Sequence, residues 1–194
     1  MRNRLPVLFV LAVAALFAGC GLQSIPQAEN QVDAAWAEVQ NQYQRRADLV
    51  PNLVNTVKGF ATQEKEVLTQ VTQARARATG VTLQADQLTP ENLRQFEEAQ
   101  NQLGGALSRL MVVAERYPEL RSNQNFRDLQ AQLEGTENRI AIARRRYIEA
   151  VQAFNDLVTV PPTSFTNAII YHKSPKPQFT ATTPGAERAP EVQF

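Results

Sequence analysis

The chain has 194 residues, of which 43% are hydrophobic and 20% are charged, and its formal net charge is +1. This length suits one domain with appendages, and the near-neutral charge excludes a general electrostatic attraction to nucleic acid or to acidic lipid. The single cysteine excludes an intramolecular disulfide, and the single histidine excludes a histidine-rich metal site.

The N-terminus has the charge and hydropathy of an export signal. Arg2 and Arg4 precede an apolar run over residues 5–18, and cationic residues beside roughly 14 apolar ones are typical of a secretory signal peptide. A membrane-spanning helix needs about 20 apolar residues, and this run is shorter and contains Pro6. The pattern therefore predicts export, with an uncleaved membrane anchor as the alternative.

The apolar run ends in Leu16-Phe17-Ala18-Gly19-Cys20, which resembles the lipobox of bacterial lipoproteins. The resemblance implies that a signal peptidase removes residues 1–19, that the thiol of Cys20 is the lipid attachment site, and that residues 20–26 form the anchor and tether. Phe17 departs from the pattern, because leucine usually stands three residues before the cysteine. Each buried methylene of an acyl chain contributes roughly 0.8 kcal/mol, so two or three chains hold a protein firmly.

The first half of residues 27–158 carries two predicted helices, with apolar residues at helical spacing. The first is marked by Ala28, Val32, Trp36, Val39 and Tyr43. The second ends near Gly80 and is marked by Leu53, Val57, Phe60, Glu64, Val67, Val71, Ala74 and Ala78. Between them Pro51 lacks an N–H and disfavours α geometry at Val50, which predicts a break or strong kink near residues 46–51.

The third predicted helix covers residues 90–117. Thr89 is suited to cap it and Pro90 to occupy its first turn, and Pro118 stops it. Its inward positions are Leu93, Phe96, Gln100, Leu103, Leu107, Leu110, Ala114 and Tyr117. Gly104 and Gly105 in its middle indicate a close neighbouring helix or a kink.

The fourth predicted helix has the most regular pattern, a heptad seam. Its members are Phe126, Leu129, Leu133, Thr136, Ile140, Ala143, Tyr147, Ala150, Phe154 and Leu157. Together the segments predict an all-α protein with an antiparallel up-and-down four-helix bundle over residues 27–158. Three long helices with a kink near Pro51 are the alternative.

Proline dominates the residues after Val160, where six of the eleven prolines fall. This composition predicts a proline-rich tail over residues 159–194 that is extended or partly disordered. Isolated apolar residues in the tail are expected to dock on the bundle, namely Phe165, Ile169, Ile170 and Phe179.

The sequence contains no nucleophile elbow, Walker loop, HExxH or dinucleotide fingerprint, so we expect no catalytic, cofactor-binding or metal-binding residues. His172, the only histidine, lies in the tail and is predicted to be solvated. Glu64 falls on an apolar seam, where pairing with Arg109 or Arg144 is favoured over a role as a tuned acid or base. The arginines at 144–146 point in different directions around a helix, and we expect them to form a solvated face and to pair with carboxylates, not to bind an anion.

Two other residue pairs have local explanations. Arg45 and Arg46 precede Asp48 at the predicted helix junction, where we expect an ion pair or a cap. Trp36 and Tyr43 stand one seven-residue step apart, which is the spacing of core residues and not of an aromatic ligand site.

Four separated blocks of the sequence resemble the LemA family. They are NQYQRRADLVPNLVNTVKGF at 41–60, AERYPELR at 114–121 with the Phe126 and Leu129-Gln130 that follow, ENRIAIARRRY at 137–147 with Phe154-Asn155, and the closing PEVQF at 190–194. The resemblance covers roughly residues 26–194. It implies an antiparallel helical bundle held at the membrane by an N-terminal segment, lying outside the cytoplasm, with no established enzymatic activity or cofactor. Family members usually carry a membrane-spanning segment, whereas Cys20 suggests a lipid here.

Two functional hypotheses follow from these expectations. The first is a non-enzymatic interaction or scaffold protein of the bacterial cell envelope, tethered on the extracytoplasmic side through lipidated Cys20, that binds envelope or membrane proteins and no nucleic acid. The alternative is a small-ligand-binding or enzymatic bundle with a core site. Such a site would need a second inward acid beside Glu64, and the seams supply none, which favours the first hypothesis.

Overall fold

The computed structural model describes residues 22–179, and that range contains helices and connecting segments but no strand. The elements are α2 (Ser24–Phe60), α3 (Lys65–Gly80), the 3-10 turn η1 (Ala85–Gln87), α4 (Pro90–Ala114), α5 (Pro118–Ser122), α6 (Gln124–Thr159), α7 (Thr163–Thr166) and the π-helical turn η2 (Asn167–Tyr171). The predicted all-α class is confirmed. Within residues 22–179, no helix combines the length and the apolar content needed to cross a membrane.

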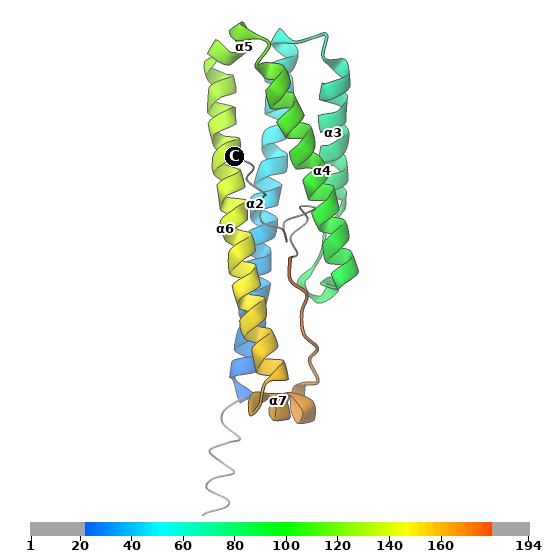
Figure 1. Ribbon diagram of the computed structural model, residues 1–194, viewed down its shortest axis with the longest axis vertical. Helices are drawn as coiled ribbons and strands as arrows, with labels where there is room; N and C mark the ends of the chain where they lie inside the picture. Colours follow the sequence, from blue (N-terminus) through cyan, green and yellow to red (C-terminus); the bar gives the residue numbers. More distant parts are fainter. Residues whose placement is uncertain (1–21, 180–194) are drawn as a thin grey trace, which may run out of the picture.

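Two of the four long helices are much longer than the other two, and this divides the molecule into two parts (Figure 1). α2 and α6 run antiparallel along its whole length, whereas α3 and α4 form a shorter antiparallel pair beside them at one end. We call the part where all four lie together, residues 34–149, the head. The stalk is formed by residues 22–33 and 150–171, where α2 and α6 continue beyond the ends of α3 and α4. The expected bundle over residues 27–158 therefore differs from the structure, in which four helices lie together only in the head.

α2 continues through Pro51, so the predicted break near residues 46–51 is wrong. Proline has no N–H to donate to the carbonyl four residues earlier, which here is that of Ala47. Arg75 on α3 supplies the missing donor, because its Nε donates to the Ala47 carbonyl oxygen at 2.8 Å. The chain turns instead at residues 61–64, between α2 and α3.

The buried face of α2 repeats in heptads from one end of the helix to the other. All five predicted core residues of its first half are buried, and beyond them the face continues with Arg46, Val50, Leu53 and Val57. Phe60, which the sequence places on the same face, is 39% exposed because it is the last residue of the helix, where the chain begins to turn.

α4 begins as the sequence predicts. The Thr89 hydroxyl accepts a hydrogen bond from the Asn92 N–H at 3.2 Å, and Pro90 occupies the first turn. The inward positions from Leu93 to Ala114 are buried, whereas Tyr117 lies beyond the end of the helix and is half-buried. No helix packs closely against Gly104, since a Cβ there would meet only the Arg46 guanidinium at 3.8 Å.

α6 keeps its predicted seam as far as Tyr147 and then departs from it. Asn123 caps the helix by accepting a hydrogen bond from the Phe126 N–H at 3.1 Å. After Tyr147 the buried residues are Val151, Phe154 and Val158, while the predicted Ala150 and Leu157 are half-buried. A straight α-helix has 3.6 residues per turn and drifts away from a strict seven-residue repeat, which accounts for the shift.

The first part of the proline-rich tail folds into a compact turn. Residues 163–171 form α7 and η2 at the free end of the stalk, and residues 172–179 run back toward the head (Figure 1). Phe179 is buried, as expected, whereas Phe165, Ile169 and Ile170 do not dock and are 65%, 76% and 51% exposed. The turn directs these three side chains outward, away from α2 and α6.

Candidate functional site: a buried polar layer and its cleft

The residues singled out in the sequence are spread over the molecule. Cys20 and residues 1–19 lie outside the described residues. His172 is exposed at the end of η2, in the left-handed backbone region with φ of 52°. Within residues 22–179, no group of three or more histidine, cysteine, aspartate or glutamate side chains is placed to hold a metal ion.

Glu64 lies in the turn between α2 and α3, not on a helix seam. Its Oε1 accepts hydrogen bonds from Arg116 Nη2 at 3.0 Å and from the Tyr117 hydroxyl at 3.1 Å. The expected pairing with Arg109 or Arg144 is therefore wrong, because the turn brings Glu64 beside the end of α4. Desolvation of the hydroxyl, and secondarily the hydrogen bond to Glu64, raise the pKa of Tyr117.

Arg46 forms the centre of a buried polar layer in the head. Its Nη2 donates to the Gln100 backbone carbonyl at 2.9 Å and to the Gln100 Oε1 at 2.7 Å, and its Nη1 donates to Glu137 Oε1 at 3.1 Å. Gln100 in turn donates from Nε2 to the Ala78 carbonyl at 3.1 Å. One guanidinium thus connects α2, α4 and α6, and Gln100 extends the layer to α3; the local ion pair expected for Arg46 is not found.

A second ion pair, with a buried carboxylate, completes the layer on the stalk side of Arg46. Arg144 Nη2 donates to Glu97 Oε1 at 2.7 Å, and the Glu97 side chain is only 4% exposed. The guanidinium carbon of Arg144 also lies 4.3 Å from the centre of the Phe179 ring. Its Nη1 donates a hydrogen bond to the Tyr43 hydroxyl at 3.4 Å. Arg145 and Arg146 are exposed, as expected of a solvated face, and Arg144 pairs with a carboxylate, as was also expected.

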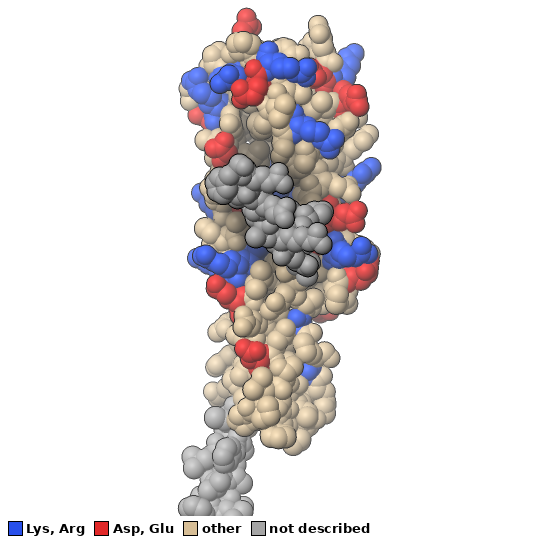
Figure 2. All heavy atoms as spheres, viewed as in Figure 1, with Lys and Arg blue, Asp and Glu red and all other residues tan. Residues whose placement is uncertain are grey.

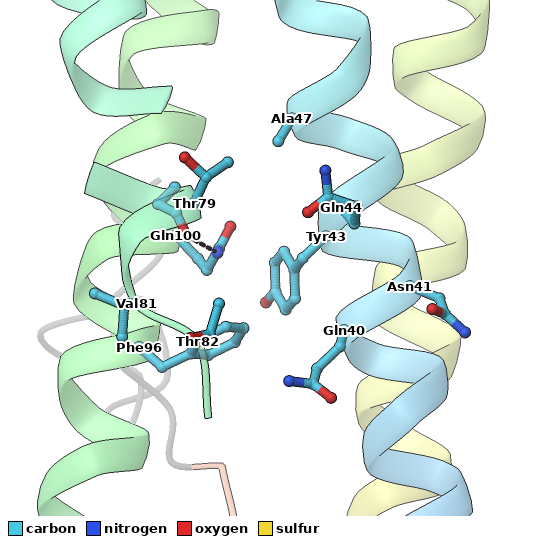
Figure 3. Close-up of a pocket in the computed structure, with 11 residues that line it drawn as sticks. Gln40, Asn41, Tyr43, Gln44, Ala47, Thr79, Val81, Thr82, Phe96 and Gln100 are labelled. Atoms are coloured by element: carbon cyan, nitrogen blue, oxygen red, sulfur yellow. Dashed lines mark hydrogen bonds between the residues drawn. The ribbon is translucent and has the colours of Figure 1, made fainter. Parts of the chain in front are cut away.

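A cleft of about 280 Å³ opens beside this layer, between α2 and the α3–α4 pair (Figure 3). Tyr43 on α2 faces Phe96 and Gln100 on α4 across it. Gln40, Gln44 and Thr79 line its outer part. Both amide atoms of Gln100 are already bonded within the protein, and these bonds use one of its two N–H donors and one of its two acceptor lone pairs.

The chemistry of the layer is that of a structural ion-pair network. Buried charges are costly unless each is paired and hydrogen-bonded, and here each guanidinium meets a carboxylate and a further oxygen. Since only one register of the helices brings these partners together, the layer aligns α2, α4 and α6.

Sequence reasoning missed Arg46 and Glu97, although a signal for Arg46 was present. The buried residues of α2 alternate in steps of three and four, as in Trp36, Val39 and Tyr43. The next two steps reach Arg46 and Val50, so Arg46 lies on the buried face of the helix. The predicted break at Pro51 ended that seam too early. Glu97 follows Phe96 and stands three residues before Gln100, and all three side chains are buried. The prediction that the helix seams supply no second inward acid is therefore wrong.

Comparison with known proteins supports one family. A family model described as the LemA family matches residues 35–194, which includes both members of the Arg46–Glu137 and Arg144–Glu97 ion pairs. No curated protein matches the sequence. The matched range covers most of the chain, and we conclude that the protein belongs to the LemA family.

Proposed function

We propose that the protein is a membrane-tethered helical scaffold of the bacterial cell envelope, without catalytic activity of its own. The observation that carries the proposal is the separation of its two ends. At about 1.5 Å per residue, the 37-residue α2 is roughly 55 Å long. Leu22, which follows Cys20 by two residues, lies at the free end of the stalk, and the turn into α3 lies at the far end of the head (Figure 1). A lipid on Cys20 would then hold the head away from the membrane.

The distribution of charge supports a role for the head in binding proteins. Lysine, arginine, aspartate and glutamate side chains gather over the head, while the stalk carries few (Figure 2). Exposed pairs such as Arg121 with Glu115 and Arg94 with Glu91 place both signs on the same surface. Surfaces with mixed charge favour specific protein partners by electrostatic complementarity.

The N-terminal sequence supports the envelope location. The apolar run over residues 5–18 and the Ala18-Gly19-Cys20 sequence suit an exported lipoprotein. Membership of the LemA family agrees with the membrane attachment that the resemblance implies.

The cleft supports a second candidate, a bundle that binds a small ligand. Its volume of about 280 Å³ is near the lower end of ligand pockets, which range from about 300 to 1,000 Å³. The buried groups beside it are bonded to one another: Gln100 to Arg46, and Glu97 to Arg144. A ligand would have to displace these bonds, so we favour the scaffold.

Crosslinking in living cells followed by affinity purification tests the scaffold directly. The wild type is expected to capture a defined set of envelope proteins, and Cys20→Ala is expected to lose them. A Gln44→Trp variant, which fills the outer part of the cleft, is the control and should capture the same set as the wild type. Capture that survives Cys20→Ala would contradict the tether, and capture lost only in Gln44→Trp would favour a ligand in the cleft.

A further inference from the structure

The free end of the stalk carries most of the large apolar side chains that the structure exposes. Among residues 22–179 they number eight, and five lie at this end. We call these five the apolar tip: Leu22, Val160, Phe165, Ile169 and Ile170. The Tyr171 hydroxyl donates to the Leu22 carbonyl at 2.6 Å, which fastens the turn formed by α7 and η2 to the start of α2. Apolar side chains gathered on one exposed surface mark an interaction site.

The same end is almost without charge. No aspartate, glutamate, lysine or arginine occurs in residues 157–172 or in residues 22–28. Figure 2 shows this end of the molecule as an uncharged surface, in contrast with the head. A surface that meets the interior of a lipid layer must avoid charged groups, since their transfer from water is costly.

The three exposed apolar side chains of the turn, Phe165, Ile169 and Ile170, do not hold it in place. Polar bonds do this: Asn167 Nδ2 donates to the carbonyls of Val158 and Lys173, and its Oδ1 accepts from the Lys173 N–H. The Lys173 ammonium also pairs with Glu29 on α2 at 2.9 Å. Polar bonds and the packing of Tyr171 against the core thus hold the turn, and Phe165, Ile169 and Ile170 stay exposed.

The position of the tip in the chain identifies what covers it. Leu22 follows Cys20 by two residues, and the apolar run over residues 5–18 lies just before that. A lipid on Cys20 and an uncleaved apolar anchor would both bring Leu22 to a bilayer, and Tyr171 holds the turn beside it.

We propose that the apolar tip inserts into the interface of the membrane that anchors the protein, with Phe165, Ile169 and Ile170 among the acyl chains. The inference rests on the proposed tether and adds a second, non-covalent contact to it. Two contacts at one end restrict how far the stalk tilts, so the head is held upright over the lipid surface.

Depth-dependent fluorescence quenching tests this contact on the full chain. Ile169→Cys is labelled with the environment-sensitive fluorophore NBD and reconstituted in phosphatidylcholine–phosphatidylglycerol vesicles that contain nitroxide-labelled lipid. Val112→Cys, on a residue that is 69% exposed near the far end of α4, is the matched control. Interfacial side chains lie about 5–10 Å deep, so quenching at position 169 should exceed that at position 112 by about threefold or more.

The outcomes separate failure of the tip from failure of the tether. The parent protein without an added cysteine is labelled in parallel, and its signal is subtracted. Labelling of the parent would show that the Cys20 thiol is free. That result would contradict the lipid anchor but not the insertion of the apolar tip. Equal quenching at positions 169 and 112 would overturn the inference. A blue-shifted emission at position 169 without quenching by the nitroxide-labelled lipid would also overturn it, because the apolar tip would then be covered by a second copy of the chain and not by acyl chains.

Discussion

Arg46 shows how one side chain connects helices that are distant in the sequence. Its bonds reach Gln100 and Glu137, which are 54 and 91 residues away. The two partners differ in environment, since Gln100 is buried whereas the Glu137 side chain is 46% exposed. Solvent screens the ion pair with Glu137, so the contribution of Arg46 to stability comes mainly from Gln100.

Replacing Arg46 should therefore cost far more than replacing its carboxylate partner. Arg46→Met leaves the buried side-chain oxygen of Gln100 without its donor, and we expect a loss of about 1–3 kcal/mol in the free energy of unfolding. Glu137→Gln, the matched control, should cost less than about 1 kcal/mol. Urea unfolding followed by circular dichroism measures both, and equal losses would show that the ion pair, not Gln100, is the important contact.

The burial of Tyr147 should make the free energy of unfolding depend on pH in the alkaline range. Burial, and secondarily the charge of Asp33, raise the pKa of its hydroxyl. Above about pH 10 the tyrosine ionises in the unfolded chain but stays protonated in the folded one, so its contribution is complete below that pH and is lost as the pH rises. The free energy of unfolding should fall by up to about 1.4 kcal/mol per pH unit from this group.

The variant Tyr147→Phe isolates this effect. It loses the hydrogen bond from the hydroxyl to the Pro177 carbonyl, 2.9 Å long, and should be about 1 kcal/mol less stable at pH 7. Its stability should nevertheless fall less steeply than that of the wild type between pH 10 and 11. Denaturant unfolding at a series of pH values measures the two slopes, and parallel slopes would refute the assignment to Tyr147.

At the level of single residues, the sequence predicted apolar burial well and polar burial poorly. Trp36, Tyr43 and Phe96 are buried as their spacing indicates. Glu97 is buried because Arg144, 47 residues away, meets it at 2.7 Å. Such a partner is created by tertiary packing, and helical periodicity alone gives no reason to bury a charge.

At the level of helices, Pro51 is the clearest case of tertiary structure overriding a local rule. Proline inside a helix removes one backbone hydrogen bond, and this loss usually breaks or kinks the helix. Here Arg75 donates to the Ala47 carbonyl that Pro51 leaves free, so the helix continues. The sequence identified the missing bond correctly, but the donor that replaces it lies 28 residues away on α3.

A double-mutant cycle tests this explanation. Arg75→Ala should destabilise the wild type by about 1–2 kcal/mol, because the Ala47 carbonyl loses its donor. In a Pro51→Ala background the new N–H serves that carbonyl, so the same change should cost close to nothing. Thermal or urea unfolding of the four proteins gives the coupling energy. A value near zero would mean that Arg75 does not compensate for the proline.

The returning segment at residues 172–179 gives a further prediction, which concerns its last side chain. Phe179 lies 6.1 Å from Trp36 and 5.2 Å from Tyr147, measured between ring centroids. Phe179→Ala should cost about 3 kcal/mol and admit water to Trp36, the only tryptophan. A red shift of the tryptophan emission in the folded variant measures this opening.

The matched control for that experiment is Phe165→Ala, on a side chain that is 65% exposed. It should change the free energy of unfolding by less than about 0.5 kcal/mol and leave the emission unchanged. A folded Phe179→Ala protein with the emission of the wild type would show that residues 172–179 do not shield the core.

At the level of the whole molecule, the unequal helix lengths determine the shape. α2 and α6 have 37 and 36 residues, whereas α3 and α4 have 16 and 25, so the shorter pair ends before the stalk does. The sequence predicted an all-helical chain with four helices but placed the first turn at Pro51, which made the first helix too short and hid the stalk. The turn at residues 61–64 contains no proline and carries a weaker sequence signal.

The proposed function depends on the distance that the stalk sets between the two ends of the molecule, more than on any single side chain. The charged head and the apolar tip lie at opposite ends of the molecule, and their surfaces suit different surroundings (Figure 2). A protein anchored by its stalk would present the head to partners at a height set by α2.

The most direct test of this account is site-specific photocrosslinking in living cells. A photoreactive amino acid replaces either Val112, exposed on the head, or Gln152, exposed on the stalk, in the wild-type and Cys20→Ala backgrounds. For a tethered scaffold that acts through its head, we expect discrete protein adducts from position 112 that disappear in Cys20→Ala, and few adducts from position 152. Adducts that form equally from Cys20→Ala, or only from position 152, would contradict a tethered scaffold that acts through its head.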